Sequence, residues 1–357
     1  MSKILHTSVR YTLVHSRFRN YSSRAAILLG SLLLSAATTA QQTSWTVPRT
    51  TDGVPDLQGM WTNNTITPLE RPQRFADKAF LSEAEQAELE REIAEYAVEK
   101  DLPSDPNRPP PTKGQIDLED SYNNFWFDSG TSVAIYNGER RTSLVVDPAD
   151  GRIPAQTEAA RAKALRAAEQ RSNAPFDGPE SRPLAERCLL SFGSSSGPPM
   201  LPILYNNHYQ IVQSPGYVMI LVEMVHDARI IRIDSEPLPV VMKPWLGDST
   251  GRWEGDTLIV ETSNFNPNQS FRNSSENFQV TERFTRVGPD TINYSFTIND
   301  PETFTGPWSA EIPMNRTDDR MYEYACHEGN YALPGVLAGA RVEEQSELEG
   351  QSGAASR

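Results

Sequence analysis

The stretch ILYNNHYQIVQSPGYVMILVEMVHDARIIRID, residues 203–234, is the longest strand-like run of the chain. Two turn-like breaks interrupt it, Ser214-Pro215-Gly216 and His226-Asp227-Ala228-Arg229. Pro, Gly and Asp favour turns because of their backbone preferences. The stretch therefore predicts consecutive antiparallel strands at about 205–213, 217–226 and 229–234.

The second of these turns sets the pairing of charged side chains if Asp227-Ala228 is a two-residue loop. Counting outward from it, His226 faces Arg229, and Glu223 faces Arg232. Charges in otherwise apolar strands need partners, because an isolated buried charge costs several kcal/mol. We interpret these four residues as candidate catalytic residues. A cross-strand ion pair between Glu223 and Arg232 that only fixes the register is the structural alternative.

Residues 1–40 have the composition of a secretory signal peptide. Five basic residues and no acid are followed by the uncharged run Ala25–Ala37 and small residues suited to cleavage. The apolar run is shorter than the roughly 20 residues that span a bilayer. We expect a periplasmic or secreted protein with no stable membrane span after cleavage, and an uncleaved anchor is the alternative.

The charge balance excludes two classes of partner. Removing the five basic residues of the leader changes the formal net charge from −14 to −19. Nucleic acid and anionic membrane surfaces attract proteins through Lys and Arg, so an acidic chain is a poor match for both. We expect a small-molecule ligand and no nucleic acid.

The rest of the chain divides into three predicted parts. Residues 41–115 form an N-terminal extension with one helix, at about 82–99, and a Pro-rich connector. Residues 116–335 form a β-barrel domain that includes a second helix at about 157–171. Residues 336–357 are rich in Glu, Gly and Ser and predict a disordered acidic tail.

The fold class is predicted to be mainly β. Asn137-Gly138 lies between two short β runs and is a strong hairpin signal. After the first three strands, further strands are predicted at 252–261, 278–287, 291–298, 310–315 and 321–326. Short strands with Gly, Pro, Asn or Asp between them indicate an antiparallel β-barrel, calycin-like in form, or a sandwich, with two peripheral helices.

Cys188 and Cys326 are the two cysteines of the chain. Disulfides persist in exported proteins because the compartment is oxidising. We therefore predict a Cys188–Cys326 disulfide, which would tie the segment before the central hairpins to the last predicted strand.

His226 and His327 both lie at predicted strand ends, where one barrel rim could hold them together. Histidine titrates near neutral pH and suits general acid/base catalysis. In this interpretation Glu223 orients the histidine or acts as a second base, and Arg229 or Arg232 stabilises developing negative charge. Two unrelated loop histidines are the alternative.

No cofactor is favoured by these residues, and the cofactor stays unknown. A zinc-like metal is the alternative, with His226, His327 and Glu328 as ligands. Glu328 is otherwise a candidate ligand-binding residue beside His327.

Trp245 and Trp253 lie in a segment that also holds three acids and one arginine. They predict a stacking wall for an aromatic or cyclic ligand, whereas a turn whose tryptophans cap the barrel is the alternative. The leading functional hypothesis is a lyase, isomerase or hydrolase acting on such a compound in the barrel mouth. The alternative is a non-catalytic periplasmic barrel protein that binds a small ligand.

Four segments carry a resemblance: GDSTGRWEGDTLIVETSNFN (247–266), TERFTRV (281–287), INDPETFTGPW (298–308) and YEYACHEGNY (322–331). With their WEGDTLxVET, DPxxxxxPW and YEYxCHEGN motifs, they resemble a widespread family of uncharacterised secreted bacterial proteins with the same motifs in the same order. The resemblance covers roughly residues 55–333. It implies a bacterial, periplasmic setting and carries no particular activity.

Overall fold

The computed structural model describes residues 45–100, 107, 128–191, 197–204, 207–269 and 271–355. The predicted signal peptide lies outside these residues, and so does the Pro-rich connector apart from residue 107.

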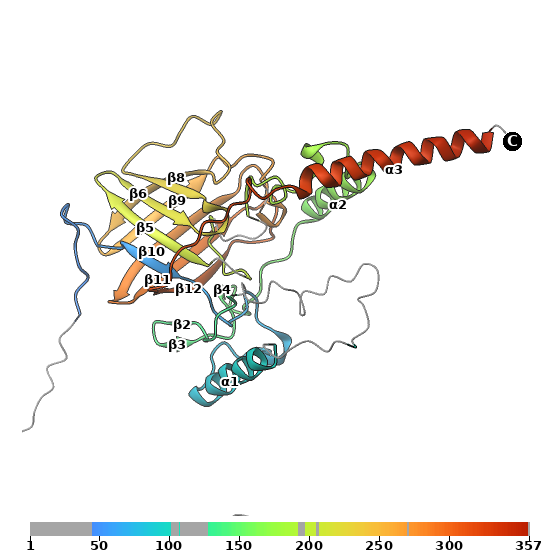
Figure 1. Ribbon diagram of the computed structural model, residues 1–357. Helices are drawn as coiled ribbons and strands as arrows, with labels where there is room; N and C mark the ends of the chain where they lie inside the picture. The colour runs from blue at the N-terminus through green and yellow to red at the C-terminus, as the bar shows by residue number, and fades with distance from the viewer. Residues whose placement is uncertain are drawn as a thin grey trace, which may run out of the picture. The chain divides into compact units, whose positions relative to one another are not determined.

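Within the described residues, nine strands close into a β-barrel (Figure 1). Their order around the barrel is β1-β5-β6-β7-β8-β9-β10-β11-β12, and β12 pairs with β1 to complete the closure. The strands are β1 (Gly59–Thr62), β5 (His208–Ser214), β6 (Tyr217–Val222), β7 (Ala228–Ile233), β8 (Asp248–Glu254), β9 (Thr257–Ser263), β10 (Gln279–Gly288), β11 (Thr291–Asn299) and β12 (Trp308–Arg316). The predicted mainly β barrel is confirmed.

The barrel is mostly antiparallel, as predicted, and one of its strand pairs is parallel. Residues Ile231–Ile233 of β7 run parallel to Ser249–Gly251 of β8. A parallel pair requires a connection that crosses from one end of the strands to the other. Residues 234–247 provide that connection, where a tight turn would have produced a hairpin.

Alternation of side chains along each strand fills the barrel interior. In β10 the residues that point inward are Val280, Glu282, Phe284 and Arg286, and the residues between them are more exposed. Large side chains from other strands meet them in one core, including the fully buried Trp61, Tyr294 and Trp308. The interior is therefore mostly apolar, with a few buried charges.

The barrel begins earlier than the predicted boundary at residue 116, because β1 lies between β5 and β12. This strand has four residues, too few to show a clear alternation. The predicted strand at 252–261 is divided between β8 and β9 by a turn at Gly255, where φ is +61°. Residues 321–326 form no strand.

Two peripheral helices match the prediction, α1 (Glu83–Lys100) and α2 (Glu158–Asn173). In the capping box of α1, Ser82 N donates to Glu85 Oε2 at 2.8 Å. The Oγ atom of Thr157 caps α2 by accepting from Ala160 N at 3.1 Å. Both helices begin where side-chain acceptors satisfy the first backbone N–H groups.

The predicted disordered tail is wrong, because most of it forms α3 (Ala332–Ala355). Asn330 Oδ1 accepts from Leu333 N at 3.3 Å at its start. Pro334 lies in the first turn, where a missing N–H costs nothing. The following Ala, Leu, Glu, Gln and Arg residues have high helix propensity, which outweighs the acidic composition.

The remaining elements are short. Asn137-Gly138 joins β2 (Ile135–Tyr136) to β3 (Glu139–Arg140) with φ of +51° and +81°, as a two-residue hairpin turn requires. β4 (Val145–Asp147) pairs with β12. Four 3-10 turns are also described: η1 (Gln73–Phe75), η3 (Pro179–Ser181), η4 (Met224–His226) and η5 (Phe271–Asn273).

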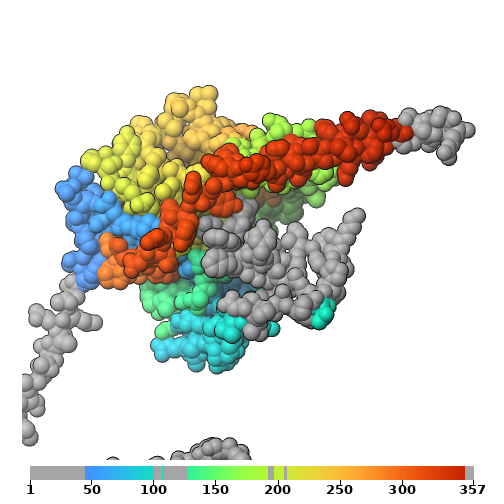
Figure 2. Space-filling model, viewed as in Figure 1, coloured from blue at the N-terminus to red at the C-terminus, as the bar shows by residue number. Residues whose placement is uncertain are grey.

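Residues 317–326, which we call the C-terminal segment, follow β12 and lie against the barrel (Figure 2). Thr317 N donates to Met60 O of β1 at 3.1 Å. Cys326 is bonded to Cys188, with Cα atoms 5.7 Å apart, which confirms the predicted disulfide. The C-terminal segment is therefore held at both of its ends.

Candidate functional site

The predicted pairing of the β6–β7 hairpin is wrong. Tyr217 pairs with Arg232, and Ile220 pairs with Arg229. Residues 223–227 therefore form the loop, and they include the 3-10 turn η4 with Val225 at a φ of +60°. Glu223 and His226 lie in this loop and do not face the two arginines.

The two arginines point to opposite sides of β7. Arg229 is buried inside the barrel and forms a bidentate ion pair with Glu282. Arg232 lies on the outer side, where it donates to Asp248 Oδ1 at 2.7 Å. At most one of them can therefore stabilise charge on a given substrate, and each already has a carboxylate partner.

The two predicted histidines lie in neighbouring segments but do not bond to each other. The Nδ1 atom of exposed His226 is 3.0 Å from Tyr324 O in the C-terminal segment. His327 is exposed, as is Glu328. In the part of the chain that the structure describes, no group of three His, Cys, Asp or Glu residues could hold a metal ion. The zinc alternative with His226, His327 and Glu328 gains no support.

The two tryptophans differ in their surroundings. Trp253 of β8 is partly buried against the hydrophobic core. Trp245 is half-buried in the connection between β7 and β8. The packing of Trp253 favours the alternative in which it covers the core, and ligand stacking on Trp245 stays a prediction.

A different histidine pairs with Glu223. The β5–β6 register pairs Tyr209 with Val222, so the next residues outward, His208 and Glu223, are neighbours. The Nδ1 atom of His208 is 2.8 Å from Glu223 Oε2. Glu223 Oε1 accepts from Tyr322 N at 2.8 Å, and the Glu223 side chain is only 2% exposed. Both oxygens of a buried carboxylate are therefore bonded, which fixes the imidazole ring.

This pair lies on the outer face of the barrel. Tyr209 and Ile211 point into the barrel, so His208 of the same strand points outward. The C-terminal segment passes over the pair, because Tyr322 contacts Glu223 and Asp319 contacts His208. The side chain of His208 is 15% exposed, so it is mostly buried but still accessible to solvent.

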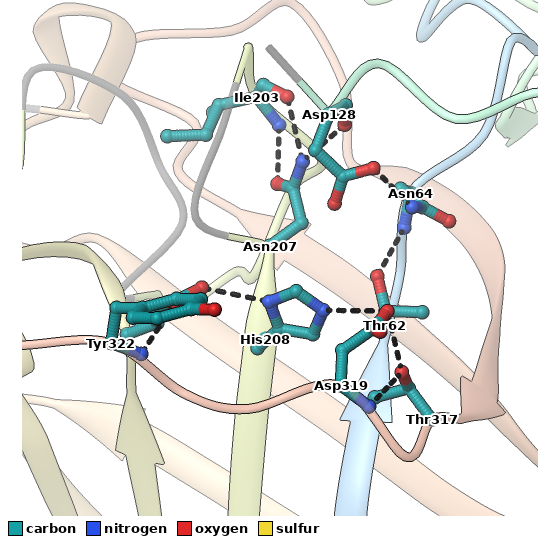
Figure 3. Close-up of polar contacts among 10 residues, drawn as sticks. Thr62, Asn64, Asp128, Ile203, Asn207, His208, Thr317, Asp319 and Tyr322 are labelled. Carbon is teal, nitrogen blue, oxygen red and sulfur yellow. Dashed lines mark hydrogen bonds and ion pairs between the residues drawn. The ribbon is translucent and has the colours of Figure 1, made fainter. Parts of the chain in front are cut away.

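The other ring nitrogen of His208 faces polar side chains (Figure 3). Nε2 is 3.8 Å from Oδ2 of Asp319, whose side chain is 79% exposed. Nearby, Asp128 Oδ1 accepts from Asn64 Nδ2 at 2.5 Å. Asp128 Oδ2 is buried and has no hydrogen-bond partner among the described residues. We call this surrounding of Nε2, made by Asn64, Asp128 and Asp319, the polar recess.

The hydrogen bond that Glu223 accepts from the His208 ring raises the pKa of His208 above its ordinary value of 6.5. Burial opposes this shift, and the negative charges of Glu223, Asp128 and Asp319 add to it. His208 therefore holds its proton at higher pH than a free histidine does, which suits the role of a general acid.

We expect stability to fall as the pH rises from 6.5 through the higher pKa of folded His208. A group whose pKa is raised on folding stabilises the folded state below its unfolded pKa, and this stabilisation disappears as the folded state loses the proton. Urea unfolding at a series of pH values measures the change. The variant His208→Gln should show a weaker dependence over this window, and an unchanged pH dependence would contradict the shift.

Comparisons with known proteins do not identify a relative of this chain. A scan against protein-family models finds no match, and a search of curated proteins finds no match either. Separately, no helix in the described ranges combines the length and apolar character needed to cross a membrane.

Proposed function

We propose that the protein is an acid/base enzyme in which His208 carries the proton and Glu223 orients it. The observation that supports this most is the buried carboxylate of Glu223, which bonds His208 Nδ1 and leaves Nε2 directed at the polar recess. A histidine held by a carboxylate on one nitrogen and free to exchange a proton on the other is a recurrent catalytic arrangement.

The proton transfer would take place at Nε2. In its protonated form His208 donates from Nε2 to an oxygen of the substrate that gains negative charge. The neutral ring then takes up a proton from another atom of the substrate or from water. Glu223 stabilises the cationic ring because it is buried and bonded to Nδ1. Asp319 is mostly exposed, so a small substrate can displace its side chain to reach Nε2.

The reaction class remains a lyase, isomerase or hydrolase on a small aromatic or cyclic compound. Such reactions need only proton transfer and positioning, which side chains can supply. A periplasmic or secreted setting is part of the proposal. The disulfide, the composition of the leader and the resemblance to secreted bacterial proteins support it.

The test uses two simple probes with the purified oxidised protein. Hydrolysis of p-nitrophenyl acetate reports acyl transfer, and exchange of the α-protons of cyclohexanone in D₂O, followed by NMR, reports proton abstraction. We expect the wild type to accelerate at least one of these. His208→Gln should lower that rate by roughly 100-fold or more, because general acid/base catalysis contributes about 10²–10⁴-fold. Glu223→Gln should lower it less and shift the pH profile.

His226→Gln and His327→Gln are matched controls, because both residues are exposed histidines outside the pair. Both variants should keep the wild-type rate. Loss of activity in either control with normal activity in His208→Gln would overturn the assignment. A protein that accelerates neither probe would favour the non-catalytic ligand-binding barrel instead.

A further inference from the structure

A second polar cluster lies inside the barrel, apart from the His208–Glu223 pair. Its side chains come from several strands and converge among apolar residues. The members are Asn63, Tyr209, Arg229, Glu282 and Tyr294. Polar groups are rarely placed in a barrel core for stability alone, since apolar residues of similar volume often do as well or better.

Hydrogen bonds join most of the cluster. Arg229 donates from Nη1 to Glu282 Oε1 at 3.1 Å and from Nη2 to Oε2 at 2.5 Å. Tyr294 OH donates to Glu282 Oε1 at 2.8 Å and accepts from Met200 N at 2.9 Å. Burial raises the pKa of the Tyr294 hydroxyl well above its usual range, and the charge of Glu282 adds to this. The cluster as a whole is therefore electrically neutral.

Three hydrogen-bonding positions of the cluster are left without partners among the described residues. Arg229 Nε and Asn63 Oδ1 are buried and unbonded. Tyr209 OH accepts from Asn63 Nδ2 at 3.1 Å, and no described acceptor takes its proton. A buried polar atom without a partner costs about 1–3 kcal/mol. The cluster thus offers two donors and one acceptor to a further group.

Residues 197–200 border the cluster. A Cβ atom placed on Gly197 would lie 3.1 Å from Arg229 Nη1 and 2.7 Å from Met200 Cγ. Met200 is fully buried, and its carbonyl oxygen accepts from Asn63 Nδ2 at 3.4 Å. The buried Met200 side chain therefore lies beside the cluster, and shortening it would create room there.

We propose that this cluster is a binding site for a small neutral molecule that carries a carboxamide on an aromatic ring. The amide oxygen would accept from Arg229 Nε and Tyr209 OH, and the amide N–H would donate to Asn63 Oδ1. An anion is disfavoured because Glu282 already neutralises Arg229, so a carboxylate would add an uncompensated buried charge.

Aromatic side chains next to the cluster pack against one another, and the ring of such a ligand would pack against them. The ring centroids of Phe284 and Tyr294 are 4.9 Å apart, and those of Tyr294 and Phe296 are 5.9 Å apart. Aromatic rings pack favourably at these separations. The site does not depend on the proposed catalytic role of His208.

Three probes of similar size distinguish an amide, a carboxylate and an apolar group as the ligand: benzamide, benzoate and toluene. Their affinities are measured by NMR titration of the oxidised full chain at neutral pH. We expect benzamide to bind at least about 10-fold more tightly than either other probe, because only it matches both the donors and the acceptor. Met200→Ala should bind benzamide more tightly than the wild type, because the shorter side chain creates room beside the cluster.

Tyr209→Phe is the matched variant, because it removes one hydroxyl. The hydrogen bond from Asn63 Nδ2 to Met200 O is preserved. It should weaken benzamide binding by roughly 10-fold and leave toluene binding unchanged. His208→Gln should bind benzamide as the wild type does, which separates this site from the proposed catalytic pair. Equal affinity for benzamide and toluene, or no binding by either the wild type or Met200→Ala, would overturn the proposal.

Discussion

Replacing Glu282 by leucine is expected to lower the free energy of unfolding by about 3–5 kcal/mol, the usual cost of removing one partner of a buried ion pair. The side chains of Arg229 and Glu282 are 1% and 0% exposed, so solvent cannot replace the lost carboxylate. Tyr294 also loses the acceptor of its hydroxyl proton. The charge of Arg229 would then stay in the barrel without compensation.

A double-mutant cycle separates the ion pair from packing. Arg229→Met should be destabilising in its own right, because it leaves the charge of Glu282 buried. The double variant carries no charge at this position and should be more stable than the sum of the two single changes predicts. Urea unfolding of the four proteins at one pH gives the coupling energy. Additive effects would show that the two residues do not depend on each other.

The His208–Glu223 pair could have been found from the sequence by counting from the first turn. The two-residue turn at Pro215-Gly216 pairs Ser214 with Tyr217. Continuing outward along both strands brings His208 opposite Glu223. The prediction counted from the second turn, which was taken to be equally tight.

The second turn could not be predicted because its backbone is unusual. Val225 and His226 have φ values of +60° and +43°. A β-branched residue such as valine rarely adopts this conformation, so Val225 does not signal it. The loop is longer than expected for this reason, and the register of every charged residue on β7 shifts with it.

The interior cluster was only partly visible in the sequence. Glu282 alternates with Val280 and Phe284 in β10, so a strand with an inward-facing acid could have been recognised. Its partner Arg229 is 53 residues away in the chain and on a strand that is not adjacent to β10. Such a contact forms across the interior of the barrel. Rules for pairing neighbouring strands therefore cannot predict it.

Helix ends and tight hairpins were predictable because single side chains decide them. Ser82 and Glu85 fix the start of α1, and Asn137-Gly138 fixes one hairpin. The parallel β7–β8 pair was not predictable, because its connection has no helix and resembles an ordinary loop. The pairing of β1 depends on residues more than a hundred positions later in the chain.

Removing the Cys188–Cys326 disulfide is expected to destabilise the folded protein by up to about 5 kcal/mol. The two cysteines are 138 positions apart, and the chain-entropy model assigns a cost of this size to a loop of that length in the unfolded state. The C-terminal segment would lose its covalent attachment at Cys326. It would still be held by the bonds from Thr317 N to Met60 O and from Tyr322 N to Glu223 Oε1.

The double variant Cys188→Ser/Cys326→Ser tests this without free thiols. Urea unfolding compares it with the oxidised wild type, and reduced wild type serves as a control for the serine side chains. NMR titration of His208 in the same variant reports whether the C-terminal segment stays in place. If the pKa of His208 is unchanged while stability falls, the disulfide acts on the unfolded state. If the pKa of His208 falls as well, the disulfide also holds the C-terminal segment in place over the His208–Glu223 pair. A loss of stability below about 1 kcal/mol would contradict the prediction, because measured disulfide contributions are typically about 2–4 kcal/mol.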